Sequence, residues 1–428
     1  MKVLVVGSGG REHALCWSIV KSPLCSKLYC APGNPGIASV AECLPIAVDR
    51  IQDLVETCRQ KAIDFVVIGP ELPLTLGLGD NLRAAGIACF GPGKLAAEIE
   101  GSKGFMKDLC MKAHVPTAAY QCFTDAEAAK TYVQTQGVPL VIKADGLAAG
   151  KGVTVAHTLD EALKAIDDAM IKNIFGAAGT SVVIEEFMEG EEVSFFALCD
   201  GVTAIPFTAA QDHKAVYDGD KGPNTGGMGA YSPAPIVNEV MQKRIMHEII
   251  DPTVEGMRAM GRPFTGVLFA GLMMTKTGPR LIEFNARFGD PETEAMLMRL
   301  KSDLLTVLIA ASEGKLSDLA LEWHDQAALC VIMAAKGYPG HYQKNTVIRG
   351  FERAASIPNT VVFHAGTQIS NTGDITSQGG RVLAITGTGS SIHEAQKAAY
   401  QAIAQIDWPE GFCRRDIGWR AIEREKIA

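Results

Sequence analysis

The sequence predicts an α/β protein with more than one domain, and three observations support this prediction. The 428 residues are enough for two or three domains, each with its own core. A content of 47% hydrophobic and 21% charged residues, with 44 glycines, is typical of a folded α/β protein rich in tight turns. From residue 3 to residue 90, short apolar stretches alternate with helical patterns, which indicates a parallel sheet.

The net charge bears on which partners the protein binds, and the cysteines bear on the cellular compartment in which it works. The net charge of −8 disfavours broad binding to nucleic acid or anionic membranes, although a local basic pocket for a small phosphorylated ligand is compatible with it. The eleven cysteines are scattered without a C-x-x-C pair, so we expect buried, reduced thiols. No apolar run reaches the ~18 residues of a membrane span. We therefore expect a cytoplasmic protein without nucleic-acid or membrane partners.

The first segment is expected to form the parallel sheet, with strands at residues 3–6, 27–30, 65–68 and 88–90. The glycines after the first strand suggest a Rossmann-like turn. The dinucleotide pattern G-x-G-x-x-G fails, however, because Glu12 stands at its third glycine and no acidic residue ends the second strand. Nicotinamide or flavin binding is therefore disfavoured, whereas Gly9 and Gly10 at a helix N-terminus still suit a phosphate.

A glycine-rich stretch in the middle of the chain has the composition of a phosphate-binding turn. V-I-K-A-D-G-L-A-A-G-K-G, which begins at Val141, joins a strand carrying Lys143 to a turn with Gly146 and Gly150, and then to Lys151. Glycines let backbone N–H groups approach phosphate oxygens, and lysines supply positive charge. The stretch is not a Walker A loop, because the final Ser or Thr is absent. The alternative is an ordinary β-hairpin with two solvated lysines.

A second polar stretch, R-L-I-E-F-N-A-R-F-G-D-P-E, suits a metal ion and an anion. If residues 281–287 form a strand, Glu283, Asn285 and Arg287 lie on one face. The carboxylate and amide oxygens are hard ligands for Mg²⁺, and the guanidinium can hold a phosphate or a carboxylate. The alternative is an edge strand with a solvated polar face and a turn after it.

The remaining segments extend the prediction to the end of the chain. A long helical pattern covers residues 239–260, and an amphipathic helix is expected at residues 391–406. Further strands are expected at residues 181–187, 193–199, 204–208 and 266–275.

These motifs together resemble a known family. The order G-S-K, V-I-K-A-D-G-L-A-A-G-K-G, V-I-E-E-F, I-E-F-N-A-R-F-G-D-P-E resembles the ATP-grasp superfamily. Within it, the chain is most similar to the phosphoribosylamine–glycine ligase (glycinamide ribonucleotide synthetase) family, through G-S-G-G-R-E-H-A, A-P-G-N-P-G, Q-D-H-K, G-P-N-T-G-G-M-G-A-Y-S-P-A-P and C-R-R-D-I-G-W-R-A-I-E-R-E. The motifs run from residue 7 to residue 425 and so cover essentially the whole chain.

The resemblance implies an α/β and α+β multidomain fold. Residues 1–101 would form an N-terminal parallel-sheet, Rossmann-like (pre-ATP-grasp) domain. Residues 102–322 would form a central ATP-grasp domain, with a mobile flap subdomain at about 118–190. Residues 323–428 would form a small C-terminal α+β domain.

The resemblance also implies an activity. ATP, glycine and 5-phosphoribosylamine would give glycinamide ribonucleotide, ADP and phosphate in purine biosynthesis, with Mg²⁺ or Mn²⁺ and through a glycyl phosphate intermediate. The protein would be a monomer or a weak homodimer. The main alternative is another ATP-grasp ligase that joins a different carboxylate and amine, and a non-catalytic nucleotide-binding protein is disfavoured because Lys143, Glu283 and Asn285 are all present.

Site residues follow from the motifs and the resemblance together. Contacts to ATP are expected from Lys103, Lys143, Gly146, Gly150, Lys151, Glu185, Phe187, Met188 and Glu192. Contacts to the other substrates are expected from Gly9, Gly10, Asn34, Pro70, Glu71, Asp212, His213, Lys214, Gly227, Gly229, Arg287 and Asp290. The catalytic residues would be Arg287, Lys143, Asp212 and His213, and the metal ligands would be Glu283 and Asn285.

Several of these assignments leave alternatives open. Glu185 and Glu192 also suit a solvated acidic turn, and Gly227 and Gly229 also suit a plain connecting loop. His213 suits a proton acceptor, but a structural histidine with satisfied ring nitrogens fits the sequence equally well. Many ATP-grasp proteins place a second acidic metal ligand on the strand before the Glu-x-Asn pair, whereas residues 266–275 contain no carboxylate. The number of bound metal ions is therefore open, with Asp290 or Glu292 as substitute ligands.

Overall fold

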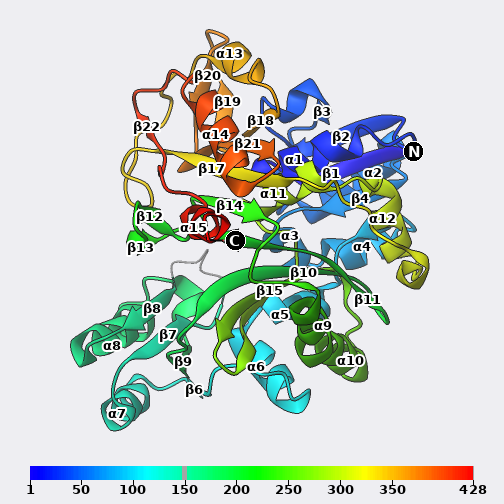
Figure 1. Cartoon of the computed structure of the whole chain (residues 1–428). Helices are drawn as coiled ribbons and strands as arrows, with labels where there is room; N and C mark the ends of the chain where they lie inside the picture. Colours follow the sequence, from blue (N-terminus) through cyan, green and yellow to red (C-terminus); the bar gives the residue numbers. More distant parts are fainter. Residues whose placement is uncertain (147–151, 428) are drawn as a thin grey trace.

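The computed structural model describes residues 1–146 and 152–427, and its N-terminal part is a five-stranded parallel sheet in the order β3-β2-β1-β4-β5 (Figure 1). In β1, Val3 and Val5 face one hydrophobic core, whereas Leu4 and Val6 face another, because successive side chains of a strand point to opposite sides. Such burial on both faces is typical of a parallel sheet. The strands are β1 (Lys2–Gly7), β2 (Lys27–Pro32), β3 (Glu42–Cys43), β4 (Phe65–Ile68) and β5 (Ala88–Phe90).

The four strands predicted for this sheet are confirmed, and β3 is a two-residue addition at the edge. Helix α1 packs on the face that carries Val3 and Val5, while α2 and α5 contribute to the core on the opposite face. The helices of this part are α1 (Gly10–Ile19), α2 (Ile51–Lys61), α3 (Glu71–Thr75), α4 (Leu78–Ala84) and α5 (Lys94–Gly101).

A nine-stranded antiparallel sheet joins the middle of the chain to its C-terminal part. Its main path is β16-β15-β10-β11-β14-β17-β21-β18, and β22 (Gly411–Phe412) pairs with β17. The pairing of β14 with β17 carries this sheet across the predicted domain limit at residue 322. Its strands are β10 (Glu191–Asp200), β11 (Ala204–Asp212), β14 (Gly229–Ser232), β15 (Thr265–Thr275), β16 (Gly278–Asn285), β17 (Ala327–Ala335), β18 (Thr360–His364) and β21 (Arg381–Gly389).

A four-stranded antiparallel sheet, β6-β9-β7-β8, forms the segment predicted as a flap, and it projects at the lower left of Figure 1. It has a small core of its own, in which Ile142 and Ile184 of the sheet are buried together with Val133 and Ile166 of the helices. Its elements are β6 (Tyr120–Phe123), α7 (Ala126–Gln136), β7 (Leu140–Ala144), β8 (Val153–Ala156), α8 (Leu159–Ile166) and β9 (Val182–Glu186).

The long helix expected at residues 239–260 is divided into α9 (Glu239–Ile245), a π-helical stretch (Met246–Ile250) and α10 (Asp251–Ala259). The helix expected at residues 391–406 is α14 (Ile392–Ile403), capped by the Ser391 hydroxyl. The other elements are α6 (Lys103–Lys112), β12 (Ala215–Tyr217), β13 (Lys221–Asn224), α11 (Glu292–Arg299), α12 (Leu304–Ser312), α13 (Phe351–Ala355), β19 (Thr367–Ile369), β20 (Ile375–Ser377) and α15 (Trp419–Glu425).

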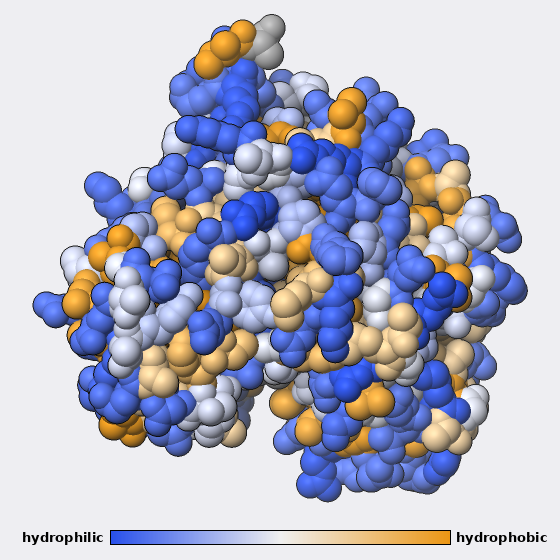
Figure 2. All heavy atoms as spheres, turned by 90° about the horizontal axis from the view of Figure 1, so that it is seen from below, coloured by the Kyte–Doolittle hydropathy of each residue, from blue (hydrophilic) through white to orange (hydrophobic). Residues whose placement is uncertain are grey.

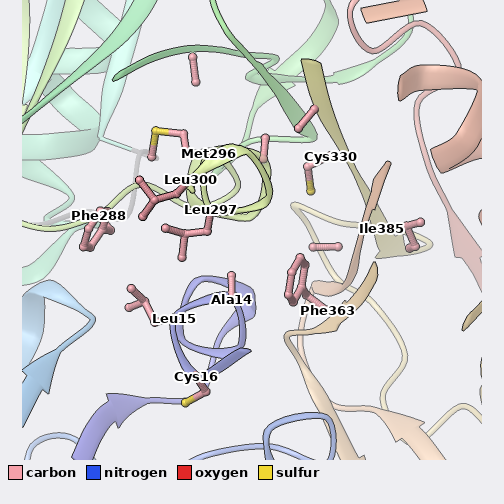
Figure 3. Packing of buried hydrophobic residues seen from close by; sticks show 14 of the residues in the cluster. Ala14, Leu15, Cys16, Phe288, Met296, Leu297, Leu300, Cys330, Phe363 and Ile385 are labelled. Carbon is pink, nitrogen blue, oxygen red and sulfur yellow. The ribbon is translucent and has the colours of Figure 1, made fainter. Parts of the chain in front are cut away.

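The largest core connects the N-terminal part to the rest of the protein. Figure 3 shows Ala14 and Leu15 of α1 beside Leu297 of α11, and Phe363 of β18 belongs to the same core. Each fully buried Leu or Phe stabilises the fold by about 1.5–3 kcal/mol. The position of α1 relative to α11 is therefore fixed by packing.

Figure 2 shows a face on which hydrophilic residues predominate and hydrophobic ones form small separate groups. Among the residues that the structure describes, no helix combines the length and apolarity that crossing a bilayer requires. All eleven cysteines are free, and Cys16, Cys30 and Cys330 are among those that are buried.

A buried carboxyl lies where these parts meet. Glu294, in the first turn of α11, is 0% exposed, and neither of its carboxyl oxygens has a hydrogen-bond partner among the described residues. Burial, and then the charge of Asp290, raise the pKa of Glu294 well above its ordinary value of 4.5. The folded protein therefore favours the neutral form of this carboxyl more than the unfolded chain does.

Glu294→Gln should consequently stabilise the protein more as the pH rises. A carboxyl with a raised folded-state pKa contributes stability that is complete below its unfolded pKa and is lost as the pH rises toward the folded pKa. Between pH 4.5 and the folded-state pKa, the advantage of the neutral variant should grow by up to about 1.4 kcal/mol per pH unit. Denaturant unfolding between pH 5 and 8 measures this, with the exposed Glu255→Gln as control. A constant difference over that range would contradict the assignment.

Candidate functional site

A cavity of about 610 Å³ lies where the three sheets meet, and residues from all of them line it. The N-terminal sheet contributes the loop after β1 and the start of α3, which is the carboxyl edge where α/β sheets usually bind ligands. The nine-stranded sheet contributes β16, the end of β11 and the start of β21. The four-stranded sheet contributes Lys143 of β7 and Glu185 of β9.

Positive charge gathers around one carboxylate in this cavity. Burial raises the pKa of Glu283, but the positive charges of Lys214, Lys143, Lys103 and Arg287 outweigh it, so that the pKa falls below its ordinary value. All five side chains line the cavity. This grouping of cations suits a polyanion, although Lys143, Lys214 and Arg287 also pair with other carboxylates of the wall.

Local structure positions the backbone of Lys103 and the ammonium groups of Lys103 and Lys143. The Ser102 hydroxyl caps α6 by accepting from the Phe105 amide, and Lys103 is the first residue of that helix. Lys103 Nζ donates to the Gly146 carbonyl at 3.1 Å. Lys143 is 2% exposed and donates to the Ile282 carbonyl of β16 at 3.2 Å. Lys143 therefore connects the four-stranded sheet to the strand that carries Glu283, whereas Lys103 connects α6 to the residue two positions after β7.

Strand β16 differs from the prediction at both ends, because it starts at Gly278 and stops at Asn285. Glu283 and Asn285 remain on the polar face, but Arg287 lies beyond the strand. Its guanidinium is held by Glu100 Oε1 at 2.9 Å, by Glu71 Oε2 at 3.3 Å and by Asn285 Oδ1 at 3.1 Å. Arg287 thus points into the cavity because side chains hold it there, and strand alternation is not the cause.

The oxygens of Glu283 and Asn285 fit a divalent cation only in part. Glu283 is paired across the sheet with Gly271 of β15, a strand without a carboxylate. Among the described residues, no group of three His, Cys, Asp or Glu side chains has the geometry of a metal site. A cation held here would therefore need further oxygens from a ligand or from water.

The predicted nucleotide contacts divide into those on the cavity wall and those outside the described residues. Phe187, Met188 and Glu192 line the cavity. Glu192 Oε2 pairs with Lys214 Nζ at 2.7 Å. Gly150 and Lys151 lie outside the described residues, and Gly146 lies behind the wall. Apolar side chains that would suit a flat ring complete this part of the wall: Val141, Val153, Val155 and Met273.

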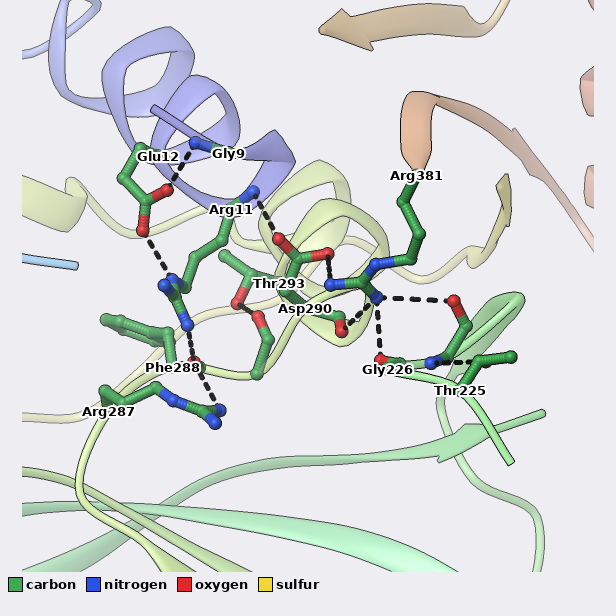
Figure 4. A network of polar contacts seen from close by, with 12 residues as sticks. Gly9, Arg11, Glu12, Thr225, Gly226, Arg287, Phe288, Asp290, Thr293 and Arg381 are labelled. Carbon is green, nitrogen blue, oxygen red and sulfur yellow. Dashed lines mark hydrogen bonds and ion pairs between the residues drawn. The ribbon is translucent and has the colours of Figure 1, made fainter. Parts of the chain in front are cut away.

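A polar network closes the cavity on the N-terminal side, as Figure 4 shows. Glu12 accepts from the Gly9 amide at 2.7 Å and pairs with Arg11 at 2.6 Å. Asp290 pairs with Arg381 at 3.1 Å. A Cβ atom at Gly9 would lie 2.9 Å from Glu12 and 3.3 Å from Asp290, which explains why glycine occupies this position. Gly9 and Asp290 line the cavity together with Pro70 and Glu71, as predicted.

His213 is not on the cavity wall, and its ring nitrogens already have partners. The Gly418 amide donates to Nε2 at 3.1 Å, so Nδ1 carries the proton and faces the Gly229 carbonyl at 3.3 Å. Burial, and then the charge of Arg414, lower the pKa of His213 to about 4. This geometry fits the structural alternative for His213, and its catalytic and substrate-binding roles stay predictions.

Four other residues predicted as substrate contacts also lie behind the wall. Asn34 donates to the carbonyls of Ser8 and His364, both at 2.8 Å, so it ties the N-terminal loop to β18. A Cβ atom at Gly227 would lie 2.6 Å from Pro291 and 2.8 Å from Asp212. Gly227 therefore acts through close packing of the backbone. The four residues are Gly10, Asn34, Gly227 and Gly229.

The sequence interpretation missed Arg381, which begins β21 and lines the cavity from the C-terminal part. Its Nη1 donates to the carbonyls of Gly226 and Asp290 at 2.7 and 2.8 Å. It also lines a second cavity of about 310 Å³, together with Ser8 and Tyr338. The only signal in the sequence was a single cation at the start of an apolar strand.

Comparisons with known proteins agree over the whole chain. Family models match residues 1–100 (Phosphoribosylglycinamide synthetase, N domain), 101–293 (ATP-grasp (A) domain) and 328–420 (C domain). A phosphoribosylamine–glycine ligase of Mesorhizobium japonicum is 59% identical over 428 residues, covering 100% of both chains. That of Brucella melitensis is 58% identical over 100% of this chain and 99% of its own. The crystal structure of the Thermotoga maritima ligase matches with a TM-score of 0.85 and 30% identity, over 97% of this chain and 100% of its own.

Arg381→Met should destabilise the protein by roughly 3 kcal/mol, because it leaves the half-buried Asp290 carboxylate without its cation and removes the donors to two loop carbonyls. Denaturant unfolding measures the change. Arg353→Met in the same part of the chain is the control, since that arginine is exposed. Equal stabilities of the two variants would show that Arg381 does not hold the loop.

Proposed function

The chain belongs to the phosphoribosylglycinamide synthetase family, and we infer from this that its cavity ligates glycine to 5-phosphoribosylamine with ATP. The products are glycinamide ribonucleotide, ADP and phosphate, in a step of purine biosynthesis. The observation that carries this inference is the group of four cations around Glu283, next to a wall of apolar side chains. A triphosphate and a flat base require such a pair of surfaces side by side.

Two chemical steps account for the ligation. The glycine carboxylate attacks the γ-phosphorus, the bond from that phosphorus to ADP breaks, and glycyl phosphate forms. The amine of phosphoribosylamine then attacks the glycyl carbonyl carbon, the C–O bond to phosphate breaks, and the amine loses a proton. Both steps depend on positioning and on charge stabilisation, with no protein nucleophile.

The cations serve the first step. We assign Lys103 and Lys143 to the ATP phosphates, where positive charge stabilises the negative charge that develops on the transferring group. Arg287 lies between Glu71 and Glu100, and we assign it to the carboxylate of glycine. Because it bonds to fixed carboxylates, its guanidinium is already oriented before a ligand arrives.

Asp212 serves the second step as proton acceptor. It lines the cavity, and its Oδ1 atom has no hydrogen-bond partner among the described residues. Burial, and then the charge of Glu292, raise its pKa well above the ordinary carboxylate range. A carboxylate with a raised pKa is a better base for an amine proton near neutral pH.

We assign the rest of each substrate to other residues that line the cavity. Glu185, Phe187 and Met188 would contact the adenine, and Glu192 the ribose hydroxyls. The phosphoribosylamine side would lie against Gly9, Pro70, Glu71, Lys214 and Asp290.

Glu283 and Asn285 are the residues of this chain that would hold a divalent cation, Mg²⁺ or Mn²⁺, which when bound neutralises phosphate charge. We also propose that the protein acts in the cytoplasm as a monomer or weak homodimer, and that the segment at about 118–190 moves as a flap. Small-angle scattering with and without nucleotide tests the last two points together.

The function is tested by measuring ADP release from the purified protein. Release should require glycine and freshly formed phosphoribosylamine together, and omission of either should abolish it. A panel of other amino acids and amines in the same assay separates the alternative, an ATP-grasp ligase with a different substrate pair. A higher kcat/KM for such a pair would establish that alternative.

Glu283→Gln should preserve the fold and lower turnover roughly a hundredfold, because one oxygen ligand loses its charge. The magnesium concentration needed for half-maximal turnover should rise as well. Steady-state kinetics over a magnesium titration measures both, with the exposed Glu239→Gln as control. An unchanged magnesium requirement would show that the metal assignment is wrong.

A further inference from the structure

A lysine behind the cavity wall shares a carboxylate with a lysine on it. Glu185 Oε1 lies 2.9 Å from Lys143 Nζ and 3.2 Å from Lys107 Nζ. The side chains of Lys107, Lys143 and Glu185 are 0%, 3% and 2% exposed. Lys143 and Glu185 line the cavity, whereas Lys107 does not. Lys107, Lys143 and Glu185 form a buried triad. The proposed contacts to ATP explain Lys143 and Glu185 but not Lys107.

Lys107 is fixed to the body of the protein. Its Nζ donates to Thr117 Oγ1 at 2.8 Å, and that hydroxyl donates to the Leu281 carbonyl of β16 at 2.7 Å. Lys107 itself belongs to α6, which also carries Lys103. Glu185 and Lys143, in contrast, belong to the four-stranded sheet. The lysine therefore ties the carboxylate of that sheet to the strand that carries Glu283.

The charges of the triad explain why a second lysine is needed. If the ammonium group of Lys143 turns toward a phosphate, its pair with Glu185 weakens. With Lys143 as the sole partner, this would leave a carboxylate that is 2% exposed without a counter-charge, which is strongly unfavourable. Lys107 removes that cost, because it remains on Glu185 when Lys143 moves.

We propose that Lys107 is a positioning residue that keeps Glu185 paired, so that Lys143 can exchange this carboxylate for the phosphates of a bound nucleotide. The proposal rests on the assignment of Lys143 to ATP under the proposed function. It assigns no contact between Lys107 and any substrate. Lys107 acts through Glu185 alone, which makes the two residues thermodynamically coupled in nucleotide binding.

The test is a double-mutant cycle in the full-length protein, with ADP binding measured by calorimetry. Lys107→Met should weaken ADP binding at least about tenfold, because Lys143 must now leave Glu185 unpaired. In the Glu185→Gln background the same substitution should change ADP binding less than twofold, since no buried carboxylate remains to be protected. Lys112→Met, at an exposed lysine of the same helix, is the control and should leave binding unchanged.

A purely structural role for Lys107 predicts different results. Lys107→Met would then lower the melting temperature but leave the Kd for ADP within twofold, or its effect would add to that of Glu185→Gln, and either result overturns the proposal. If Lys107→Met alone does not fold, Lys107→Met with Glu185→Gln is compared with Glu185→Gln. Equal ADP binding by these two supports the proposal, and tenfold weaker binding by the double variant overturns it.

Melting temperatures give an independent readout of the same charge balance. Glu185→Gln alone leaves two buried ammonium groups without their carboxylate, so Lys107→Met in that background should raise the melting temperature. A lower melting temperature for the double variant would count against the shared-carboxylate arrangement. Because ADP binding needs neither glycine nor phosphoribosylamine, these outcomes are distinct from a failure of the ligation assay with the unmodified protein.

Discussion

Charge balance in the cavity is the constraint on which the rest of this structure depends. Burying an ion costs free energy unless a partner of opposite charge accompanies it. Lys143 has Glu185, Lys214 has Glu192, and Arg287 has Glu71 and Glu100. These cations are therefore balanced by carboxylates in the structure. In the proposed function, the phosphates of a nucleotide would take over part of that balance.

The scaffold has to bring these pairs together from distant parts of the sequence. Packing of α1 against α11 fixes the loop after β1 beside Asp290, and the pairing of β14 with β17 brings Arg381 to the same place. Neither arrangement is local in sequence, because Arg11 contacts Asp290 across 279 positions. The shared core thus holds the walls of the cavity in place, and the salt bridges hold the individual side chains on those walls.

Local patterns were sufficient for the predicted strands, but not for short ones such as β12 and β13, and they identified much of the cavity wall. The apolar run of β1 and the alternation around Glu283 are properties of neighbouring residues, and the structure confirms both elements. The end of β16 at Asn285 was not predictable in the same way, because Arg287 is directed by Glu71 and Glu100 from the N-terminal part. The surroundings of His213 were not predictable for a similar reason, since its partner Gly418 lies 205 positions away. Arg381 has no motif around it, so only the folded chain reveals its neighbours.

The C-terminal motif C-R-R-D-I-G-W-R-A-I-E-R-E illustrates how residues outside the cavity can matter to it. The buried Arg414 donates to the Ala215 carbonyl at 3.0 Å and pairs with Asp220 and Asp416 at 2.9 and 2.8 Å. The Gly418 amide holds His213 from the same side. The segment between Asp212 and Ala215 is thereby fixed from behind, and its remaining side chains, Asp212 and Lys214, face the cavity. This motif does not line the cavity, yet it helps to orient Asp212 and Lys214. In the proposed function, these two residues contact the substrates.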